Sequence, residues 1–214
     1  MAACTGKTVH LGDGRADAGG TPCVSGQVKA SEVVWIGDSW ILVPGSQHTR
    51  VQELAGAADY RIGAVAAATM AAVADQYAAA EASATKVKVL IMDGGTWDTI
   101  QKGASDTTVN DVVDTFGRLL AQVASDGTVE HVIYFLVPEL DTIPGVAELR
   151  PLMQERCAQT TVPPCHFLDL QQIWAAHTPP PEYSTAGAIL PTDAGARAIG
   201  DAIWAIMQEH CIAQ

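Results

Sequence analysis

The residues with the clearest chemical potential in this chain follow a short apolar run, Val33–Ile36, and read Gly37-Asp38-Ser39-Trp40. An apolar run that stops at such a tripeptide presents a serine hydroxyl at the carboxyl edge of a sheet, where open α/β sheets bind ligands. A serine hydroxyl becomes a useful nucleophile only with a base within hydrogen-bond reach, a group that orients this base, and donors for the oxyanion. Ser39 is therefore the candidate nucleophile, and the alternative is a serine that caps a helix or closes a turn.

Three further segments follow Gly37-Asp38-Ser39 along the chain, in the same order as the conserved sequence blocks of a known family. Together with Gly-Asp-Ser they resemble the four blocks of the SGNH (GDSL-type) hydrolases, and the resemblance runs from Val33 to Gln208. In that family the first-block serine is the nucleophile. Its amide, a second-block glycine amide and a third-block asparagine side chain donate to the oxyanion, while a histidine before the last helix is the base and an aspartate orients it. The resemblance therefore implies a serine hydrolase fold with Ser39 as its nucleophile.

The oxyanion blocks of this chain depart from the family pattern at two positions. By register, the second-block glycine falls on Ala67, with Gly63 as the second choice. Alanine keeps the amide donor but adds a methyl group where the backbone must approach a substrate. The third block places Trp97 where the family has asparagine, and losing one such donor costs about 3–4 kcal/mol of transition-state stabilisation. The Trp97 ring either donates through its indole N–H or fills the pocket.

The usual base is missing from its expected place before the last helix. Leu190 stands at the histidine position and Gly187 at the aspartate position, or Ala186 if the loop has slipped. Leucine cannot accept a proton, so His177 and His48 are the candidate replacement bases, and the alternative for each is an ordinary surface histidine. The predicted oxyanion and pocket residues are Asp38, Trp40, Gly63, Ala67, Gly95, Trp97, Asp98 and Leu190.

The acidic and aromatic side chains of these blocks allow two interpretations each. We expect Asp38 and Asp98 to bond loop amides around the site; the alternative is that they form a metal or acid–base site with Asp93. No cysteine spacing typical of zinc is present, so we predict no metal and no cofactor. Trp40 and Trp97 follow strand ends, and they either line a cleft for sugars or aryl groups or pack into the core.

Strands and helices must alternate to bring these blocks to one edge. The predicted strands are 32–36, 59–62, 86–91, 131–136 and 166–170. The predicted helices are 64–84, 108–124 with Thr108 as N-cap and Gly127 as its end, 144–159, and a last helix capped by Thr192. This alternation predicts an α/β fold of three layers, α/β/α, with a doubly wound, five-stranded parallel sheet of the flavodoxin-like type that SGNH hydrolases share.

Composition limits the partners and the domain count. The 214 residues carry a net charge of −12, and such a surface repels phosphate backbones, so we expect no nucleic-acid partner. No apolar run approaches the roughly 20 residues of a transmembrane helix. Residues 1–30 are rich in glycine and aperiodic, which favours a flexible tether, and residues 31–214 fit one domain.

Five cysteines suggest an exported protein. Cys157 and Cys165 are spaced for a small disulfide loop, and Cys23 and Cys211 lie near the two ends of the fold, where a disulfide could join them. Cys4 follows two alanines, as at the mature start of a bacterial lipoprotein, and the alternative is a free thiol in the tether. We therefore predict a secreted or periplasmic protein whose contact with a membrane is through a lipid on Cys4.

Two function classes fit the sequence. The first is a divergent esterase that acts on short acyl or O-acetyl esters, with Ser39 as nucleophile and weak or atypical activity because the triad is incomplete. The second is a non-catalytic protein that binds a small ester, a carbohydrate or another ligand and reuses the same fold, since a fold does not determine a function.

Overall fold

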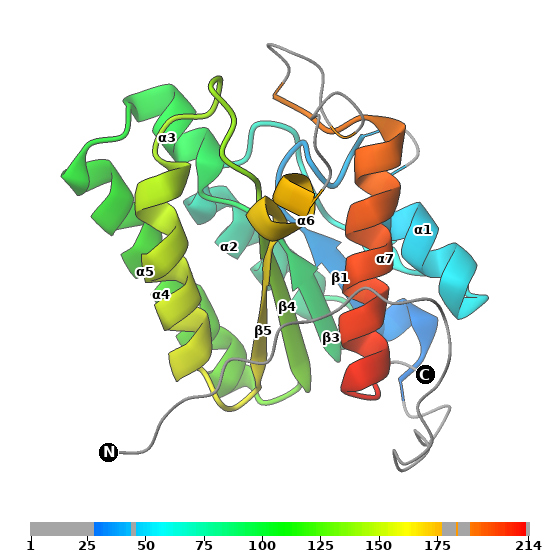
Figure 1. Ribbon diagram of the computed structural model, residues 1–214. Coiled ribbons are helices and arrows are strands. Elements are labelled where there is room, and N and C mark those ends of the chain that lie inside the picture. The colour runs from blue at the N-terminus through cyan, green and yellow to red at the C-terminus, as the bar shows by residue number, and fades with distance from the viewer. Residues whose placement is uncertain (1–27, 44–45, 177–182, 184–188, 213–214) are drawn as a thin grey trace, which may run out of the picture.

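The computed structural model describes residues 28–43, 46–176, 183 and 189–212. Five parallel strands form one sheet in the order β2-β1-β3-β4-β5 (Figure 1). The strands are β1 (Val33–Ile36), β2 (Arg61–Ile62), β3 (Val89–Met92), β4 (His131–Leu136) and β5 (Cys165–Asp169). All five predicted strands are present, and the predicted α/β class and doubly wound parallel sheet are confirmed.

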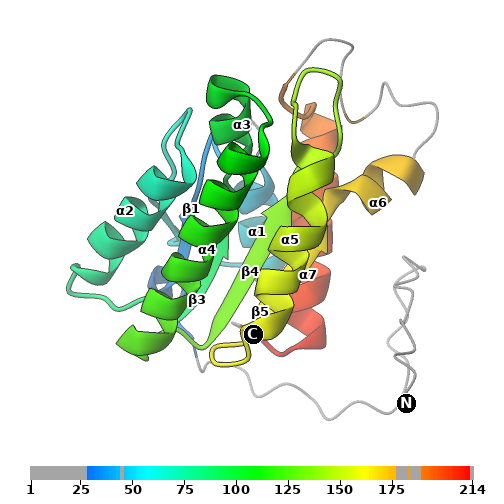
Figure 2. The ribbon, with the colours of Figure 1, turned by 90° about the vertical axis from the view of Figure 1, so that its left-hand side faces the viewer.

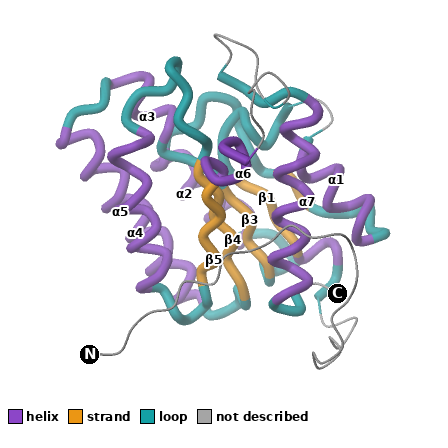
Figure 3. Tube along the Cα trace, in the orientation of Figure 1, coloured by secondary structure: helices purple, strands orange, loops and turns teal. Residues whose placement is uncertain are grey.

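Helices cover both faces of this sheet, as the two views in Figures 1 and 2 show. The helices are α1 (Gln47–Ala55), α2 (Met70–Glu81), α3 (Thr96–Lys102), α4 (Asp106–Asp126), α5 (Val146–Gln159), α6 (Leu170–Ala176) and α7 (Asp193–Glu209), after a short 3-10 turn at Ala30–Glu32. Helices α2, α4 and α5 lie on one face and α1 and α7 on the other, so the strands form the middle layer (Figure 3).

Helix caps follow from short polar side chains, although one predicted cap is wrong. Helix α4 begins earlier than predicted, because the Ser105 hydroxyl accepts the Thr108 amide and Thr108 lies inside the first turn. Gly127 ends the helix in the left-handed conformation, as predicted. The last helix is capped as expected, since the Thr192 side chain accepts the Gly195 amide. Apolar side chains at helical spacing then turn one face of α4 into the core.

The largest boundary error concerns α2, which was predicted from residue 64 but starts at Met70. The chain after β2 first continues along the end of β1: the Gly63 amide donates to the Trp35 carbonyl at 2.7 Å, and the Val65 amide donates to the Gly37 carbonyl at 3.0 Å. An alanine-rich sequence has high helix propensity, but these tertiary hydrogen bonds hold residues 63–65 beside the end of β1, and a turn at Ala66 and Ala67 follows before the helix begins. This segment is therefore placed beside the end of β1.

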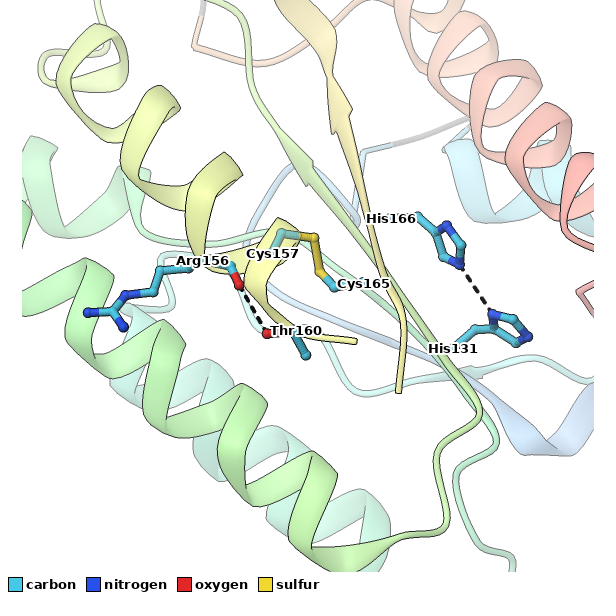
Figure 4. Close-up of a disulfide and its surroundings, with 6 residues drawn as sticks. All are labelled: His131, Arg156, Cys157, Thr160, Cys165 and His166. Carbon is cyan, nitrogen blue, oxygen red and sulfur yellow. Dashed lines mark hydrogen bonds between the residues drawn. A yellow bond between two sulfur atoms is a disulfide. The ribbon is translucent and has the colours of Figure 1, made fainter. Parts of the chain in front are cut away.

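A disulfide joins Cys157, at the end of α5, to Cys165, at the start of β5 (Figure 4). Cys211 is disulfide-bonded as well. Cys4 and Cys23 lie outside the described residues, as does nearly all of the predicted tether 1–30. Among the described helices, none is long and apolar enough to cross a bilayer.

Three histidines meet at the amino edge of the sheet, opposite the Gly-Asp-Ser turn. His131 Nδ1 lies 3.2 Å from His166 Nε2 (Figure 4), and the His166 and His210 ring centroids are 4.1 Å apart. Burial, then His210 and His131, lower the pKa of His166 to about 4. Burial, then His210, also lowers the pKa of His131, while Glu130 opposes this shift.

This cluster predicts acid sensitivity of folding. A histidine whose pKa is lower in the folded than in the unfolded state contributes full stability above its unfolded pKa, about 6.5, and loses it as the pH falls towards 4. We expect His166→Gln to lose less of its free energy of unfolding than the wild type between pH 7 and pH 4. Urea unfolding at both pH values measures this, and equal losses in the two proteins would contradict it.

Candidate active site

The turn after β1 is fixed by a glutamine from α2. The Gly37 amide donates to Gln76 Oε1 at 2.7 Å, and Gln76 Nε2 donates to the Gly37 carbonyl at 3.0 Å. Gly37 has a φ of +146°, and a Cβ at this position would lie 1.7 Å from Asp93 Oδ1 and 2.8 Å from Ile41 Cδ1. Only glycine therefore fits, and the tight turn brings the next two residues to the carboxyl edge of the sheet.

Gly37→Ala should destabilise the whole domain. The added methyl group meets a buried carboxyl and the backbone strongly disfavours a side chain at this φ, so we expect a loss of at least about 3 kcal/mol, or roughly 6–12 °C in Tm. Gly117→Ala in α4 is the matched control, because its Cβ would meet only Arg156 at an ordinary 3.7 Å. That change should stabilise by about 0.5–1 kcal/mol. Similar Tm values for the two variants would contradict this account.

Asp38 is a structural carboxylate. It is buried, accepts the Trp40 amide at 2.9 Å and the Thr96 hydroxyl at 3.3 Å, and its own amide donates to Asp93 Oδ1 at 2.7 Å. Burial, and then the neighbouring Asp38 carboxylate, raise the pKa of Asp93 well above its ordinary value, and burial also raises the pKa of Asp38. The pair therefore fixes the turn and the start of α3.

Ser39 faces the candidate oxyanion amide of the second block. The Ala67 amide donates to Ser39 Oγ at 3.2 Å, whereas the Gly63 amide already donates to the Trp35 carbonyl. Of the two candidates, the structure thus brings Ala67 to the serine. Ala67 has a φ of +59°, the left-handed conformation that favours glycine. Ala67 therefore adopts a strained backbone conformation, and in this conformation its amide points at the Ser39 hydroxyl.

The third block forms the first turn of α3. Gly95 precedes the helix in the left-handed conformation, and a Cβ there would lie 2.7 Å from Val112 Cγ1. Asp98 is buried: its Oδ2 accepts the Met70 amide at 2.7 Å, and Lys102 Nζ lies 3.4 Å from its Oδ1. Asp98 thus supports the N-terminus of α2. Trp97 is half-buried in the same turn, one residue after the threonine that contacts Asp38.

His48 and Ser39 are not in contact. Instead, His48 Nδ1 lies 2.5 Å from Ser46 Oγ and 3.2 Å from the Ile41 carbonyl, and its ring packs edge-on against Trp35. Burial lowers the pKa of His48. The side chain therefore supports the start of α1, and no hydrogen bond joins His48 to Ser39 among the described residues.

The remaining candidates lie either at the core or outside the described residues. Leu190 packs against the core, and Trp40 is buried with its ring centroid 6.0 Å from that of Trp174. His177, Gly187 and Ala186 lie outside the described residues. Within the described part of the chain, no group of three histidine, cysteine or acidic residues is placed to hold a metal ion.

Sequence reasoning missed Gln76, which holds the Gly37 turn from 39 residues away. A glutamine in a helical segment without a neighbouring motif gives no sequence indication of a structural role. Its partner could be found only once α2 was placed over β1. The sequence did single out Asp93, but only as a member of a possible metal site, whereas the structure makes it the hydrogen-bond acceptor for the Asp38 amide.

No protein-family model and no curated protein matches this sequence. Solved structures do match. A lipase/acylhydrolase from Enterococcus faecalis has a TM-score of 0.66 at 16% identity, over 83% of this chain and 95% of that chain. A lipolytic protein of the G-D-S-L family from Desulfitobacterium hafniense has a TM-score of 0.65 at 15% identity, over 81% and 98%.

A third similar structure is a carbohydrate esterase whose active site "displays divergent catalytic and non-catalytic binding functions". It has a TM-score of 0.58 at 12% identity, over 83% of this chain and 64% of that chain. At these identities the likeness shows the fold: the chain has the three-layer architecture of the GDSL-type lipolytic hydrolases.

Proposed function

We propose that this protein is an SGNH-type ester hydrolase with Ser39 as its nucleophile and short acyl or O-acetyl esters as its minimal substrates. The observation that carries the proposal is the 3.2 Å contact between the Ala67 amide and Ser39 Oγ at the carboxyl edge of the sheet. A donor in this position serves the oxyanion that forms when the hydroxyl attacks a carbonyl. The neighbouring Asp38 and Gly37 fix the turn that presents the hydroxyl.

The reaction follows the two-step course of serine esterases. Ser39 Oγ bonds to the carbonyl carbon, its proton passes to a base or to water, and the ester C–O bond breaks as the alcohol leaves with a proton. Water then cleaves the acyl-enzyme and releases the acid. A site that keeps its nucleophile and part of its oxyanion hole but lacks the usual base retains at most about 10³–10⁴-fold acceleration over water. We therefore propose slow turnover, with His177 as the remaining candidate base.

Covalent labelling tests the nucleophile directly. A fluorophosphonate reacts with an activated serine, so intact mass spectrometry of the wild type should show one adduct, and peptide mapping should place it on Ser39. Ser39→Ala should remain unlabelled. Ser46→Ala is the matched control, because Ser46 is buried and contacts His48, and this variant should label like the wild type. An unlabelled wild type, or equal labelling of Ser39→Ala, would refute the proposal.

The second candidate is a non-catalytic ligand-binding protein. It is favoured by Leu190, which packs against the core at the position where the resemblance expects a base, and by the divergent functions that the similar carbohydrate esterase displays. This candidate predicts saturable binding of an ester or a carbohydrate that survives Ser39→Ala and is lost in Trp97→Ala. Binding lost in Ser39→Ala would count against it.

We also propose that the protein acts outside the cytoplasm. The disulfide between Cys157 and Cys165 supports an oxidising compartment, and Cys4 has the context of a lipid acceptor. Metabolic labelling with an alkyne fatty acid tests the anchor. The wild type should incorporate the label and Cys4→Ser should not, whereas labelling of Cys4→Ser would contradict lipidation at Cys4.

A further inference from the structure

Helix α2 covers one face of the sheet (Figure 2). A groove on this face is lined by residues of the edge strand β2 and of α2. Its volume is about 680 Å³, within the usual range of small-molecule sites. One end is formed by the loop Ala66–Ala68 and the other by Arg61 and Ser83. Because β2 has only two residues and is an edge strand, nothing in the sheet covers this side of α2.

The lining of this groove suits an apolar chain without branches. Helix α2 forms one wall, in which the small side chains of Ala72, Ala79 and Ala80 leave space along the helix on either side of Asp75 and Gln76. At the far end, Arg61 Nη1 donates to the Ala80 carbonyl at 3.3 Å and to Ser83 Oγ at 2.5 Å, whereas Nε and Nη2 of Arg61 are buried without a hydrogen-bond partner among the described residues. Two polar α2 side chains line the middle of the groove: Gln76, whose amide is hydrogen-bonded to Gly37, and Asp75, which is exposed to solvent. Between Arg61 and Ser83 at the far end and the loop Ala66–Ala68, the other lining residues are apolar.

The groove begins at the proposed oxyanion amide. Ala67 lines it and also donates its amide to Ser39 Oγ. If the carbonyl of a bound ester lies between the Ala67 amide and Ser39 Oγ, one of its two substituents lies beside the loop Ala66–Ala68. Leu190, the position that the resemblance assigns to the base, shortly precedes α7, and α7 covers the other face of the sheet (Figure 1). In the family that the chain resembles, the base at this position gives its proton to the leaving alcohol, so the resemblance implies an alcohol towards α7 and an acyl part towards α2.

We propose that this groove holds the linear acyl chain of the substrate, so that the preferred acyl group is longer than acetyl. This inference rests on the proposed function and deepens it by naming the acyl class. Each methylene that leaves water for an apolar site contributes about 0.8 kcal/mol, which is close to fourfold in affinity. Affinity should therefore rise steeply from a butanoyl to a decanoyl group.

Binding of a ligand that cannot be hydrolysed separates this inference from catalysis. Methyl ketones present an acyl group without a leaving group, so 2-pentanone serves as the butanoyl probe and 2-undecanone as the decanoyl probe. Calorimetric titration of Ser39→Ala should give saturable binding of 2-undecanone, with at least tenfold weaker binding of 2-pentanone. Wild type should bind both probes with the same preference.

Adjacent alanines on α2 provide the variant and its control. Ala79 lines the groove and Ala78, also exposed, does not, and leucine is a good helix former at both positions. Ala79→Leu should weaken 2-undecanone binding at least tenfold, while Ala78→Leu should bind like the parent. Equal binding in both variants, or no saturable binding of 2-undecanone, would overturn the acyl groove. If the wild type bound 2-undecanone but was not labelled by the fluorophosphonate, the proposed hydrolase function would be overturned and the proposed groove would still be supported.

Discussion

Leu190→His combined with Gly187→Asp should raise kcat for ester hydrolysis by about 10²–10⁴-fold, the usual contribution of a positioned general base. The two changes restore the residue types that the SGNH resemblance expects before α7, at positions whose spacing already matches the family. The Thr192 cap and the α7 helix are in place, so the backbone that would carry the histidine exists. Initial rates on p-nitrophenyl butyrate measure the gain.

The control for this gain is Leu190→Gln with Gly187→Asp, which is polar at the same place but supplies no base. It should leave kcat near the wild-type value. Both double variants lose the packing of Leu190 against the core, so thermal unfolding must show that they remain folded at the assay temperature. A folded histidine variant without a rate gain would show that Leu190 does not occupy the base position relative to Ser39.

Trp97→Asn should raise kcat by about a hundredfold or more, since one oxyanion-hole donor contributes roughly 10²–10³-fold. Trp97 lies in the first turn of α3, directly after Thr96, whose hydroxyl contacts the carboxylate of Asp38. An asparagine at this position presents an amide donor where the ring now stands. Trp97→Leu is the control, because it removes the ring without adding a donor.

Single-turnover rates with p-nitrophenyl butyrate distinguish the two roles of the Trp97 ring. If the ring fills the pocket, Trp97→Leu should bind substrate at least as well as the wild type and react no faster. If the indole N–H were already the donor, both variants would be slower than the wild type. A slower Trp97→Asn would therefore contradict the prediction of a vacant donor position.

The sequence was sufficient for the fold because hydrophobic patterning and caps are local. The strand at His131–Leu136 and the cap at Thr192 are predicted correctly, since each depends on residues within a few positions. The start of α2 is wrong for a non-local reason. Its alanine-rich approach pairs with the end of β1 through the Gly63 and Val65 amides, which no local pattern encodes.

The candidate site was predictable only in part. Alignment with the second block of the resembled family predicted Ala67 as an oxyanion position, and in the structure its amide donates to Ser39 Oγ. In contrast, the Gln76 side chain that holds the turn and the Ser46 partner of His48 depend on how helices pack on the sheet. Side chains of this kind acquire their partners from tertiary contacts, so single-sequence reasoning identifies the candidates but not their partners.

The nucleophilic role of Ser39 can be measured by comparing two proteins. Release of p-nitrophenol from p-nitrophenyl butyrate should be measured for the wild type and for Ser39→Ala side by side, at equal protein concentration. The account predicts slow, saturable turnover by the wild type and background hydrolysis by Ser39→Ala. Equal rates for the two proteins would contradict it and would direct attention to ligand binding in place of catalysis.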